Sequence, residues 1–436
     1  MKIPSPMTYE ECLEYMYEQL PMFHRIGNAA FNKSLDNILA LCEALDNPQH
    51  KFKSVHVAGT NGKGSSSNML AAILQNSGYK TGLYTSPHLK DFTERIRING
   101  LQIPKEKVVQ FVEQHKELFA KIQPSFFEMT VALAFEHFVE EEVDIAVIEV
   151  GLGGRLDSTN IITPEVCLIT NISFDHQSIL GETLQEIAAE KAGIIKENVP
   201  VIISQTQAET VAVFEEKARE MHAPIVFADK HLDVINPDVN MDARIFDVYK
   251  GDMVFLSNLE LGLLGSYQEF NLPGVLMTVE ELRKKGYDIS EYNIREGLKY
   301  VEEITGFKGR WQVLQENPLM ICDTGHNEAG MKAVLAQIER LNLPKVHFVF
   351  GAVNDKDITK ILQLLPSEFT YYFCQANIPR ALLVDDLFKQ AKSTGLSGQK
   401  YNSVMEAVHA AKATAKENEL IFIGGSTFVV AEVDDL

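Results

Sequence analysis

The feature that most constrains this chain is an apolar, strand-like run that ends in a glycine-rich loop and continues into a helical pattern. Residues 55–65 read Val-His-Val-Ala-Gly-Thr-Asn-Gly-Lys-Gly-Ser, and apolar residues then recur at helical spacing over 69–74, with Gly78 as a stop. Glycines let backbone N–H groups close on phosphates, while the helix N-terminus and Lys63 add positive charge. The order of strand, loop and helix therefore predicts a phosphate-binding loop in an α/β fold.

The loop departs from the strict phosphate-loop pattern at two positions. Val57 stands where the pattern needs Gly, and Gly64 stands where it needs Ser or Thr. A flexible glycine turn between a strand and a helix is the alternative interpretation. Residues 59–65 resemble the variant loop of the Mur ligase superfamily, and the Gly64-Ser65 ending resembles its folylpolyglutamate synthase and dihydrofolate synthase branch.

The composition is that of an ordinary soluble globular protein. The 436 residues suffice for two or three domains, and 45% of them are apolar while 23% are charged. A net charge of −20 argues against general binding to nucleic acids or to anionic membranes. The five cysteines show no paired spacing that would indicate a disulfide framework or a zinc site. Without a signal peptide or a membrane-length apolar run, the sequence favours a cytoplasmic location.

Three polar residues that follow strand-like runs are candidate metal ligands. Ser86 comes after a short strand, Glu149 lies near the end of an apolar run rich in β-branched residues, and His176 follows another such run. The carboxyl ends of parallel strands meet at one edge, beside Lys63, and buried carboxylates are normally paired or bound to metal. A turn at Ser86, an exposed strand end at Glu149 and a structural role for His176 are the alternatives. The matching Thr-Ser-Pro and Asp-His segments of the family imply that Ser86 and His176 bind magnesium.

Lys191 shares an apolar face with Ile187 in the helix that we predict over residues 183–198. Burying an ammonium without a partner is costly, so a salt bridge, a stem whose head reaches water, or a chemical modification must accompany it. Residues 190–193, Glu-Lys-Ala-Gly, resemble the family segment whose lysine is carbamylated by carbon dioxide. The resemblance implies a carbamylated Lys191 that holds a second magnesium ion.

Residues 200–262 alternate short strand-like segments with charged turns, which predicts an antiparallel flank beside the parallel sheet. Residues 265–271 then resemble the family motif Gly-x-[His/Tyr]-Gln-x-x-Asn. The resemblance implies that Gln268 and Asn271 contact the nucleotide base. The family continues with Ala, whereas Leu-Pro-Gly follows here at 272–274, which leaves the start of the next helix open.

The chain changes character near residues 300–308. Beyond them, strand-like runs alternate with helical patterns, which predicts a second, Rossmann-like α/β domain. The runs span 319–322, 346–350, 370–373 and 420–423. We therefore predict two domains: 1–300, a Mur-ligase-type ATP-binding domain with a mostly parallel sheet, and 301–436, a C-terminal ligase domain.

Residues 323–327 of this second domain read Asp-Thr-Gly-His-Asn and resemble the family form Asp-Gly-Ala-His-Asn. Arg310 precedes them in a Gly-Arg pair that the family also has. The resemblance implies that Arg310 faces the γ-phosphate from across the cleft. It also implies that Asp323 and His326 position ATP and the incoming glutamate.

Candidates for the substrate side of the site are less specific. They are Phe127 and Glu128, which match a family pair near the pterin pocket, Arg155 in a glycine-rich turn, and Ser426 in Gly-Gly-Ser. Core packing of the aromatic residue and a surface turn at Ser426 are the alternatives. Residues 92–99 resemble the mobile loop that lies over the substrate in the family.

In order, these motifs resemble an ATP-dependent ligase that adds L-glutamate to dihydropteroate and to the γ-carboxyl of reduced folates through an acyl phosphate. The resemblance implies ATP and Mg²⁺ at the site, L-glutamate and a dihydropteroate or folate as substrates, catalytic roles for Lys63, Lys191 and His326, and a monomer. The residues expected to bind nucleotide are Gly59, Thr60, Asn61, Gly62, Lys63, Gly64, Ser65, Gln268, Asn271, Arg310 and Asp323.

Three alternatives remain open. One is polyglutamylation alone. Another is a peptidoglycan-precursor ligase, which usually places a domain of roughly a hundred residues before the loop. Here 58 residues precede Gly59, and their spacing predicts two helices over 9–20 and 34–45. The third is a nucleotide switch, which would not need Arg310 and His326 from a second domain.

Overall fold

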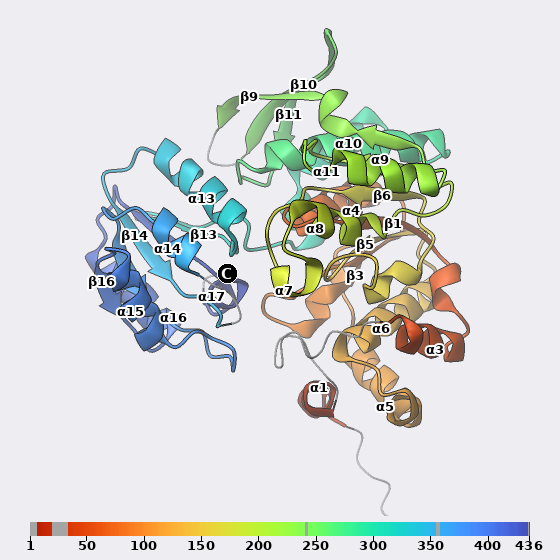
Figure 1. The fold of residues 1–436 in the computed structure, drawn as a ribbon, viewed down its shortest axis with the longest axis horizontal. Helices are drawn as coiled ribbons and strands as arrows, with labels where there is room; N and C mark the ends of the chain where they lie inside the picture. Colours follow the sequence, from red (N-terminus) through yellow and green to blue (C-terminus); the bar gives the residue numbers. More distant parts are fainter. Residues whose placement is uncertain (1–6, 20–33, 240–242, 355–357, 435) are drawn as a thin grey trace, which may run out of the picture.

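The computed structural model describes residues 7–19, 34–239, 243–354, 358–434 and 436, which build three β-sheets covered by helices (Figure 1). Two helices precede the phosphate loop as the spacing predicts, α1 (Tyr9–Gln19) and α3 (Asp36–Ala44). Leu20, the last residue of the first predicted helix, lies outside the described residues. Within the described part of the chain, no helix has the length and apolar character that crossing a membrane requires.

The largest sheet has eight strands in the order β4-β3-β2-β5-β1-β6-β7-β8. They are β1 (Lys53–Ala58), β2 (Thr81–Tyr84), β3 (Ile96–Ile98), β4 (Leu101–Gln102), β5 (Ile145–Glu149), β6 (Val166–Ile169), β7 (Val201–Ile203) and β8 (Ile225–Phe227). The strands β2, β5, β1, β6, β7 and β8 are parallel to one another, whereas β3 and β4 are added antiparallel at one edge of the sheet. The predicted mostly parallel sheet is therefore confirmed, and the carboxyl ends of β1, β5 and β6 meet at one edge.

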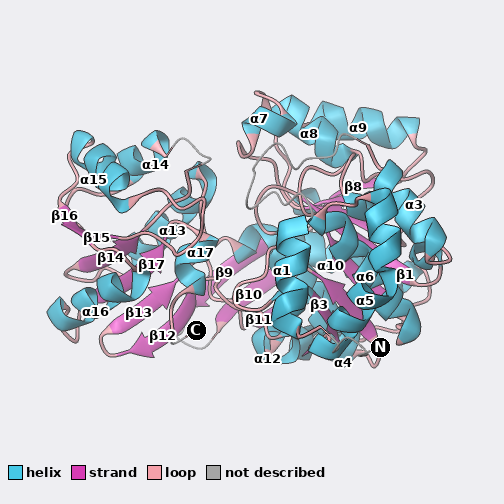
Figure 2. Cartoon of the chain, turned by 90° about the horizontal axis from the view of Figure 1, so that it is seen from below, coloured by secondary structure: helices cyan, strands magenta, loops and turns pink. Residues whose placement is uncertain are grey.

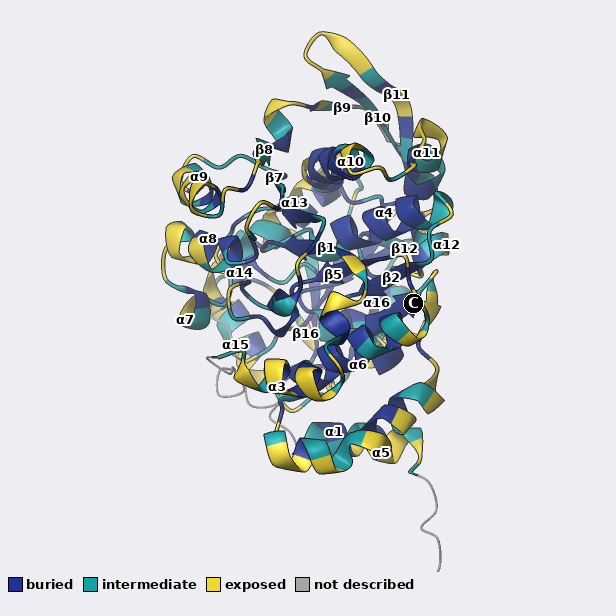
Figure 3. Ribbon diagram, turned by 90° about the vertical axis from the view of Figure 1, so that its right-hand side faces the viewer, coloured by how far each residue is buried: buried dark blue, intermediate teal, exposed yellow. Residues whose placement is uncertain are grey.

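Helices cover both faces of this sheet, which explains why its strands read as continuous apolar runs. The covering helices are α4 (Lys63–Asn76), α5 (Lys105–Ile122), α6 (Phe126–Glu140), α8 (Leu184–Ala192), α9 (Val211–Glu220), α10 (Gln268–Lys284) and α11 (Glu291–Lys299). Val55 and Val147 pack with α4, α10 and α11, while Ala146 and Ile148 pack with α5 and α6 on the other face. Figure 3 shows the strands buried between helices whose outer faces are exposed.

Residues 200–262 differ from the prediction of one antiparallel flank. β7 and β8 instead extend the parallel sheet, because α8 and α9 serve as the crossovers that parallel strands need. Only β9 (Asp233–Val239), β10 (Arg244–Lys250) and β11 (Met253–Leu261) are antiparallel, and they form a separate sheet, at the top in Figure 1. Strands of three residues carry too little periodicity to reveal their direction in the sequence.

Helix α10 continues through residues 272–274, Leu-Pro-Gly, where the sequence departs from the family motif. Pro273 lies inside the helix and cannot donate a backbone hydrogen bond. One turn is instead bridged by a side chain: Gly274 N–H donates to Ser204 Oγ at 3.1 Å, and Ser204 Oγ donates to the Phe270 carbonyl at 2.6 Å. A Cβ at Gly274 would lie 2.5 Å from Ser204 Oγ, so the glycine makes room for this bridge.

Residues 92–98, part of the segment 92–99 that resembles a mobile loop of the family, have regular secondary structure, and Arg95 among them lines the cavity described below. Residues Phe92–Arg95 form a 3₁₀ helix that leads into β3, and β3 pairs with β2. Phe92 and Ile96 are buried, and Arg95 Nε donates to His88 Nδ1 at 2.8 Å. Apolar and cationic side chains buried in this way hold the segment in place.

The C-terminal part forms a six-stranded sheet in the order β12-β13-β17-β14-β15-β16, with helices on both faces (Figure 2). The strands are β12 (Gln312–Glu316), β13 (Leu319–Cys322), β14 (Val346–Phe350), β15 (Thr370–Phe373), β16 (Gly398–Lys400) and β17 (Leu420–Gly424). The helices are α13 (Glu328–Arg340), α14 (Thr359–Leu364), α15 (Val384–Ser393), α16 (Val404–Thr414) and α17 (Thr427–Ala431). All strands but β12 are parallel, which confirms the Rossmann-like prediction.

The division into domains at residue 300 stays a prediction. Helix α12 (Val301–Thr305) packs against α4, and Val301 belongs to the apolar cluster of the first sheet. Arg97 Nη1 also donates to the Thr305 carbonyl at 2.8 Å. We therefore propose that the boundary lies just after Thr305, and we call the parts on either side the first unit and the C-terminal unit.

Candidate active site

A cavity of about 550 Å³ lies between the carboxyl ends of the large-sheet strands and the C-terminal unit. The first unit lines it with residues 59–65 of the phosphate loop and with the segments that follow β5 and β6. The C-terminal unit lines it with Arg310, with residues 323–326 and with residues 426–428. Both units therefore contribute to one site, at the edge where parallel α/β sheets bind ligands.

The phosphate loop needs glycine at two positions. Gly59 and Gly62 have φ values of 145° and 85°, which residues with a Cβ atom rarely adopt. A Cβ at Gly59 would lie 1.8 Å from Thr170 Oγ1, and a Cβ at Gly62 would lie 2.1 Å from Asn271 Oδ1. The loop is thus closely packed against β6 and α10, and its glycines are fixed by sterics.

The ammonium of Lys63, the first residue of α4, is folded back over this loop. Lys63 Nζ donates to the carbonyl oxygens of Gly59 and Thr60, both at 3.1 Å. Burial lowers the pKa of Lys63, and the carboxylates of Glu149 and Asp175 oppose that shift. A phosphate group entering the loop would meet this cation together with the N-terminus of α4.

The residues after β6 hold the loop from one side. Thr60 N–H donates to the Asn171 carbonyl at 2.8 Å, and Asn61 N–H donates to Asn171 Oδ1 at 3.1 Å. Ser173 N–H in turn donates to Thr60 Oγ1 at 3.0 Å. Two residues of the same short segment, Asn171 and Ser173, thus hold the loop through three hydrogen bonds.

Glu149, the last residue of β5, faces the loop from the other side. Its carboxylate is 4% exposed, which excludes the alternative of an exposed strand end. Ser86 N–H donates to Glu149 Oε2 at 3.1 Å. Burial raises the pKa of Glu149, while Lys63 opposes that shift most strongly. A buried carboxylate needs a partner of opposite charge, and Lys63 supplies positive charge to Glu149 in this structure.

The polar groups at this edge of the sheet fit magnesium in part. Ser86, Glu149 and His176 all line the cavity. The described residues contain no group of three or more His, Cys, Asp or Glu side chains that could hold a metal ion by themselves. Mg²⁺ is usually held by one or two carboxylates together with water and substrate phosphates. The residues present therefore fit Mg²⁺ that arrives with a nucleotide, and they do not form an all-protein site.

Lys191 in α8 is buried on the face that the sequence indicates, with 4% exposed. No salt bridge among the described residues involves Lys191, which lines the cavity. Lys191 Nζ instead donates to the Gly59 carbonyl at 2.9 Å. Burial first, and then Lys63, lower the pKa of Lys191 to about 7. α8 ends at Ala192, six residues before the predicted end, because Gly193 packs directly on the backbone of Arg155.

Asp323 organises the C-terminal side of the cavity. Its Oδ2 accepts from Trp311 N–H at 2.8 Å and from the Tyr267 hydroxyl at 2.6 Å, and its Oδ1 accepts from Gly325 N–H at 2.7 Å. Burial and the neighbouring Asp323 carboxylate raise the pKa of Tyr267, so this hydroxyl stays protonated and donates. The carboxylate therefore fixes the turn that carries His326.

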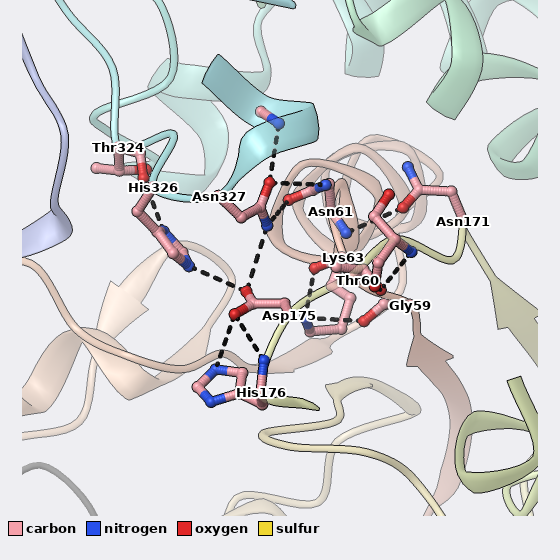
Figure 4. A network of polar contacts seen from close by, with 12 residues as sticks. Gly59, Thr60, Asn61, Lys63, Asn171, Asp175, His176, Thr324, His326 and Asn327 are labelled. Atoms are coloured by element: carbon pink, nitrogen blue, oxygen red, sulfur yellow. Dashed lines mark hydrogen bonds and ion pairs between the residues drawn. The ribbon is translucent and has the colours of Figure 1, made fainter. Parts of the chain in front are cut away.

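His326 reaches across the cavity to the first unit (Figure 4). Its Nδ1 lies 3.0 Å from the Thr324 carbonyl oxygen, and its Nε2 lies 3.4 Å from Asp175 Oδ2. Asn327 Nδ2 donates to the same Asp175 oxygen at 3.3 Å. Asp175, which precedes His176 after β6, is thus a contact point between the two units.

Comparison with known proteins identifies the family. Residues 57–279 match the family described as the Mur ligase middle domain, and residues 309–427 match the Mur ligase glutamate ligase domain. A Bacillus subtilis protein named dihydrofolate synthase/folylpolyglutamate synthase is 32% identical over 410 residues, which cover 92% of this chain and 94% of that protein. The chain belongs to the folylpolyglutamate synthase and dihydrofolate synthase family of Mur ligases.

Solved structures of this family extend the similarity over both units. The Escherichia coli FolC structure in complex with DHPP and ADP is 28% identical, has a TM-score of 0.85 and covers 98% of this chain and 96% of its own. The Yersinia pestis bifunctional folylpolyglutamate synthase/dihydrofolate synthase, complexed with AMPPNP and a Mn ion, is 27% identical with a TM-score of 0.84. It covers 98% of this chain and 97% of its own.

Most of the residues predicted for a ligase of this family line the cavity, and two do not. Gln268 is fully buried behind it, where its Nε2 donates to Ser65 Oγ at 3.1 Å and its Oε1 accepts from Asn271. Arg155 points outward with its side chain 56% exposed and pairs with Glu190 at 2.8 Å. The predicted residues that line the cavity from outside the phosphate loop are Ser86, Phe127, Glu128, Glu149, His176, Lys191, Asn271, Arg310, Asp323, His326 and Ser426.

Two of these lining residues also have a local structural role. Glu128 closes a capping box with Ser125 at the start of α6, and Ser426 caps α17 by accepting from Phe428 N–H at 3.2 Å. Asn171 and Asn327, which hold the phosphate loop from the segment after β6 and from the C-terminal unit, were not among the predicted site residues. Asn171 comes just after a buried strand-like run, and Asn327 ends the segment at 323–327 that resembles the family, so both positions carry a signal in the sequence.

Proposed function

We propose that this member of the family is an ATP-dependent ligase that forms an amide bond between L-glutamate and the carboxylate of dihydropteroate or of a reduced folate. The observation that carries the proposal is one cavity lined by Lys63, Glu149 and Lys191 from the first unit and by Arg310 and His326 from the C-terminal unit. A nucleotide switch would not need cations from two units. The names and ligands of the relatives supply the substrate class.

Phosphoryl transfer is the first step. A carboxylate is a poor acyl donor, so one of its oxygens attacks the γ-phosphorus of ATP, the bond to the bridging oxygen breaks, and ADP leaves. Lys63 and Arg310 offset the charge on the transferring group from opposite sides of the cavity. The backbone N–H groups of the loop hold the phosphates in line.

Amide formation is the second step. The neutral amine of glutamate attacks the acyl carbon, and the tetrahedral intermediate then loses inorganic phosphate as the carbon–oxygen bond breaks. The nitrogen releases its proton in the same sequence. His326, on the turn that Asp323 fixes, positions glutamate from the C-terminal unit. The site must exclude water during this step, because an acyl phosphate hydrolyses readily.

Magnesium and a modified lysine complete the proposed site. Ser86, Glu149 and His176 would hold Mg²⁺, which neutralises phosphate charge when it is bound with the nucleotide. A carbamate on Lys191 would place an anion beside Gly59 in place of a second cation. The Gly59 carbonyl also accepts from the ammonium of Lys63, so both lysine heads lie close together. A negative charge on Lys191 would attract Lys63, whereas a positive charge repels it.

The experiment that tests the function follows phosphate release from ATP by the purified protein. We expect release to need both a pteroate or folate acceptor and glutamate, with one amide formed per phosphate. Release without either substrate would support a nucleotide switch. Amide formation with a peptidoglycan precursor, and none with a pteroate, would support another ligase of the superfamily. A cytoplasmic location and a monomeric state stay predictions from the sequence.

A further inference from the structure

Two asparagines that lie far apart in the sequence form a reciprocal amide pair between the two units, beside the cavity (Figure 4). Asn327 Nδ2 donates to Asn61 Oδ1 at 2.8 Å, and Asn61 Nδ2 donates to Asn327 Oδ1 at 3.4 Å. Asn61 belongs to the phosphate loop, and Asn327 is the N-cap of α13 in the C-terminal unit. The pair therefore links the element that binds phosphate to the element that carries His326.

The orientation of the Asn327 amide follows from its other partners. Its Oδ1 accepts from Gly330 N–H at 2.8 Å, which is the cap of α13. The Nδ2 group must then point to the first unit, where it donates to Asn61 Oδ1 and to Asp175 Oδ2. One side chain thus ends a helix on its own unit and contacts two loops of the other.

The side chain of Asn61 contacts the C-terminal unit and is not needed to hold the backbone of the loop. Its backbone is already held, because its N–H donates to Asn171 Oδ1 and its carbonyl accepts from Thr170 Oγ1 at 2.6 Å. In the part of the chain that the structure describes, every hydrogen bond of the Asn61 side chain goes to Asn327. Phosphates bound by the neighbouring N–H groups would hold the loop in the conformation that presents this amide.

We propose that the Asn61–Asn327 pair is a latch through which a nucleotide in the phosphate loop holds the C-terminal unit closed over the cavity, so that Asn327 positions His326 during catalysis. The inference rests on the proposed function and deepens it. A nucleotide whose phosphate contacts add to those already holding Asn61 favours the closed arrangement, and closure in turn tightens nucleotide binding by the same factor. Loss of the latch leaves the ligands of the first unit intact but lets water reach the acyl phosphate.

The consequence is a change in product, in addition to any change in rate. When the C-terminal unit opens early, a water oxygen attacks the acyl carbon, the carbon–oxygen bond to phosphate breaks, and a proton leaves. The products are the starting carboxylic acid and inorganic phosphate, without an amide. The quantity to measure is therefore the ratio of phosphate released to amide formed, with ATP, acceptor and glutamate present.

The test uses Asn61→Ala, Asn327→Ser and the double variant. Serine keeps the cap of α13 but cannot reach Asn61 with an amide. We expect each single variant to raise the phosphate-to-amide ratio about two- to tenfold, as the loss of a hydrogen bond implies. The double variant should be no worse than the worse single variant, because both remove one contact. Ser403→Ala, which removes the cap of α16 away from the cavity, should keep the wild-type ratio.

Small-angle scattering gives a readout that does not depend on catalysis. AMPPNP should reduce the radius of gyration of the wild type, and both single variants should lose that compaction. The latch would be overturned if both single variants kept the wild-type ratio of phosphate to amide. It would also be overturned if the increase of this ratio in the double variant equalled the product of the two single increases. If Asn327→Ser lowers the melting temperature more than Ser403→Ala does, its effect could come from a general loss of stability. The result for Asn61→Ala then decides by itself whether the latch exists. A wild-type protein that forms no amide would refute the proposed function. The change in the radius of gyration with AMPPNP would still test the latch in that case, because it does not depend on catalysis.

Discussion

Lys63 and Lys191 donate to one and the same acceptor, the carbonyl oxygen of Gly59, at 3.1 and 2.9 Å. Two ammonium groups on one buried carbonyl repel each other. Burial lowers the pKa of Lys63, against the effect of Glu149 and Asp175. Burial and Lys63 lower the pKa of Lys191 to about 7, against the effect of Asp175. Lys191 therefore loses its proton near neutral pH, and a neutral buried amine is the form that reacts with carbon dioxide.

We predict that Lys191 carries a carbamate well above pH 7 and an ammonium well below it. The neutral amine attacks the carbon of carbon dioxide and a proton leaves, so formation follows the deprotonated fraction. Because the lowered pKa is about 7, that fraction rises as the pH passes upward through neutrality. Carbon-13 NMR under labelled carbon dioxide should show the carbamate signal on the alkaline side alone.

Two variants control this experiment. Lys191→Ala should remove the signal and most of the activity, and a short carboxylate should restore part of the activity. Lys196→Ala should keep the signal, because Lys196, although its pKa is also lowered by burial, donates to the Asn160 carbonyl and does not line the cavity. A signal that survives Lys191→Ala would place the modification elsewhere.

Removing the loop lysine should stop turnover without unfolding the protein. Lys63→Ala deletes a charge donor aimed at the transferring phosphoryl group, and loss of one such donor typically costs about a hundred- to thousandfold in rate. Its melting temperature should not fall, since burial disfavours the charge of Lys63 in the folded state. Exposed Lys51→Ala is the control for rate. More than half the wild-type rate in Lys63→Ala would refute the phosphate-loop assignment.

The hydroxyl of Ser204 should contribute to stability through α10. Ser204→Ala leaves the Gly274 N–H and the Phe270 carbonyl without their bridge beside Pro273, and the buried Gly274 N–H left unpaired costs about 1–3 kcal/mol. We expect the free energy of unfolding, from urea titration, to fall by about that amount. Ser67→Ala is a matched control, because Ser67 Oγ is buried with no hydrogen-bond partner among the described residues. Equal losses in the two variants would show that the bridge is not the cause.

The parts of the site that local patterns encode were predictable from the sequence. The loop around Lys63 has a signature because its glycines are fixed by φ angles and by contacts with Thr170 and Asn271. Strands buried on both faces gave the apolar runs that end at Glu149 and before Asp323.

Contacts between distant segments were not predictable. Asn61 and Asn327 are 266 residues apart, and no local pattern pairs them. The resemblance to a family motif named Gln268 and Asn271 together, but it could not show that Gln268 lies behind Asn271. Arg155 stands in a glycine-rich turn that does border the site, yet its own side chain turns outward to Glu190.

We predict a monomer. Lys63 and Arg310, the two cations that would face the transferring phosphoryl group, come from the two units of one chain, so no second copy is needed to complete the cavity. A net charge of −20 also makes copies repel one another at low ionic strength. Light scattering with size-exclusion chromatography should give a mass near 48.8 kDa. A stable dimer with the cavity at its interface would contradict this.

The last prediction is that one chain performs both glutamate additions, the first to dihydropteroate and the later ones to the γ-carboxyl of reduced folates. Both reactions need the same nucleotide loop, the same metal site and the same amine. They differ in which carboxylate reaches the γ-phosphate, and Phe126 and Phe127, which line the cavity, would offer apolar surface to either substrate.

Because both acceptors would occupy one cavity, each should inhibit the turnover of the other competitively with respect to the acceptor. The inhibition constant of dihydropteroate against tetrahydrofolate should then equal its own Michaelis constant when binding is fast relative to chemistry. Steady-state kinetics with the two acceptors, alone and mixed, checks both statements. An enzyme that extends tetrahydrofolate but neither converts nor binds dihydropteroate would reduce the activity to polyglutamylation. Turnover of both without mutual inhibition would instead require two separate acceptor sites, which a single cavity lined by Phe127 and Arg310 does not provide.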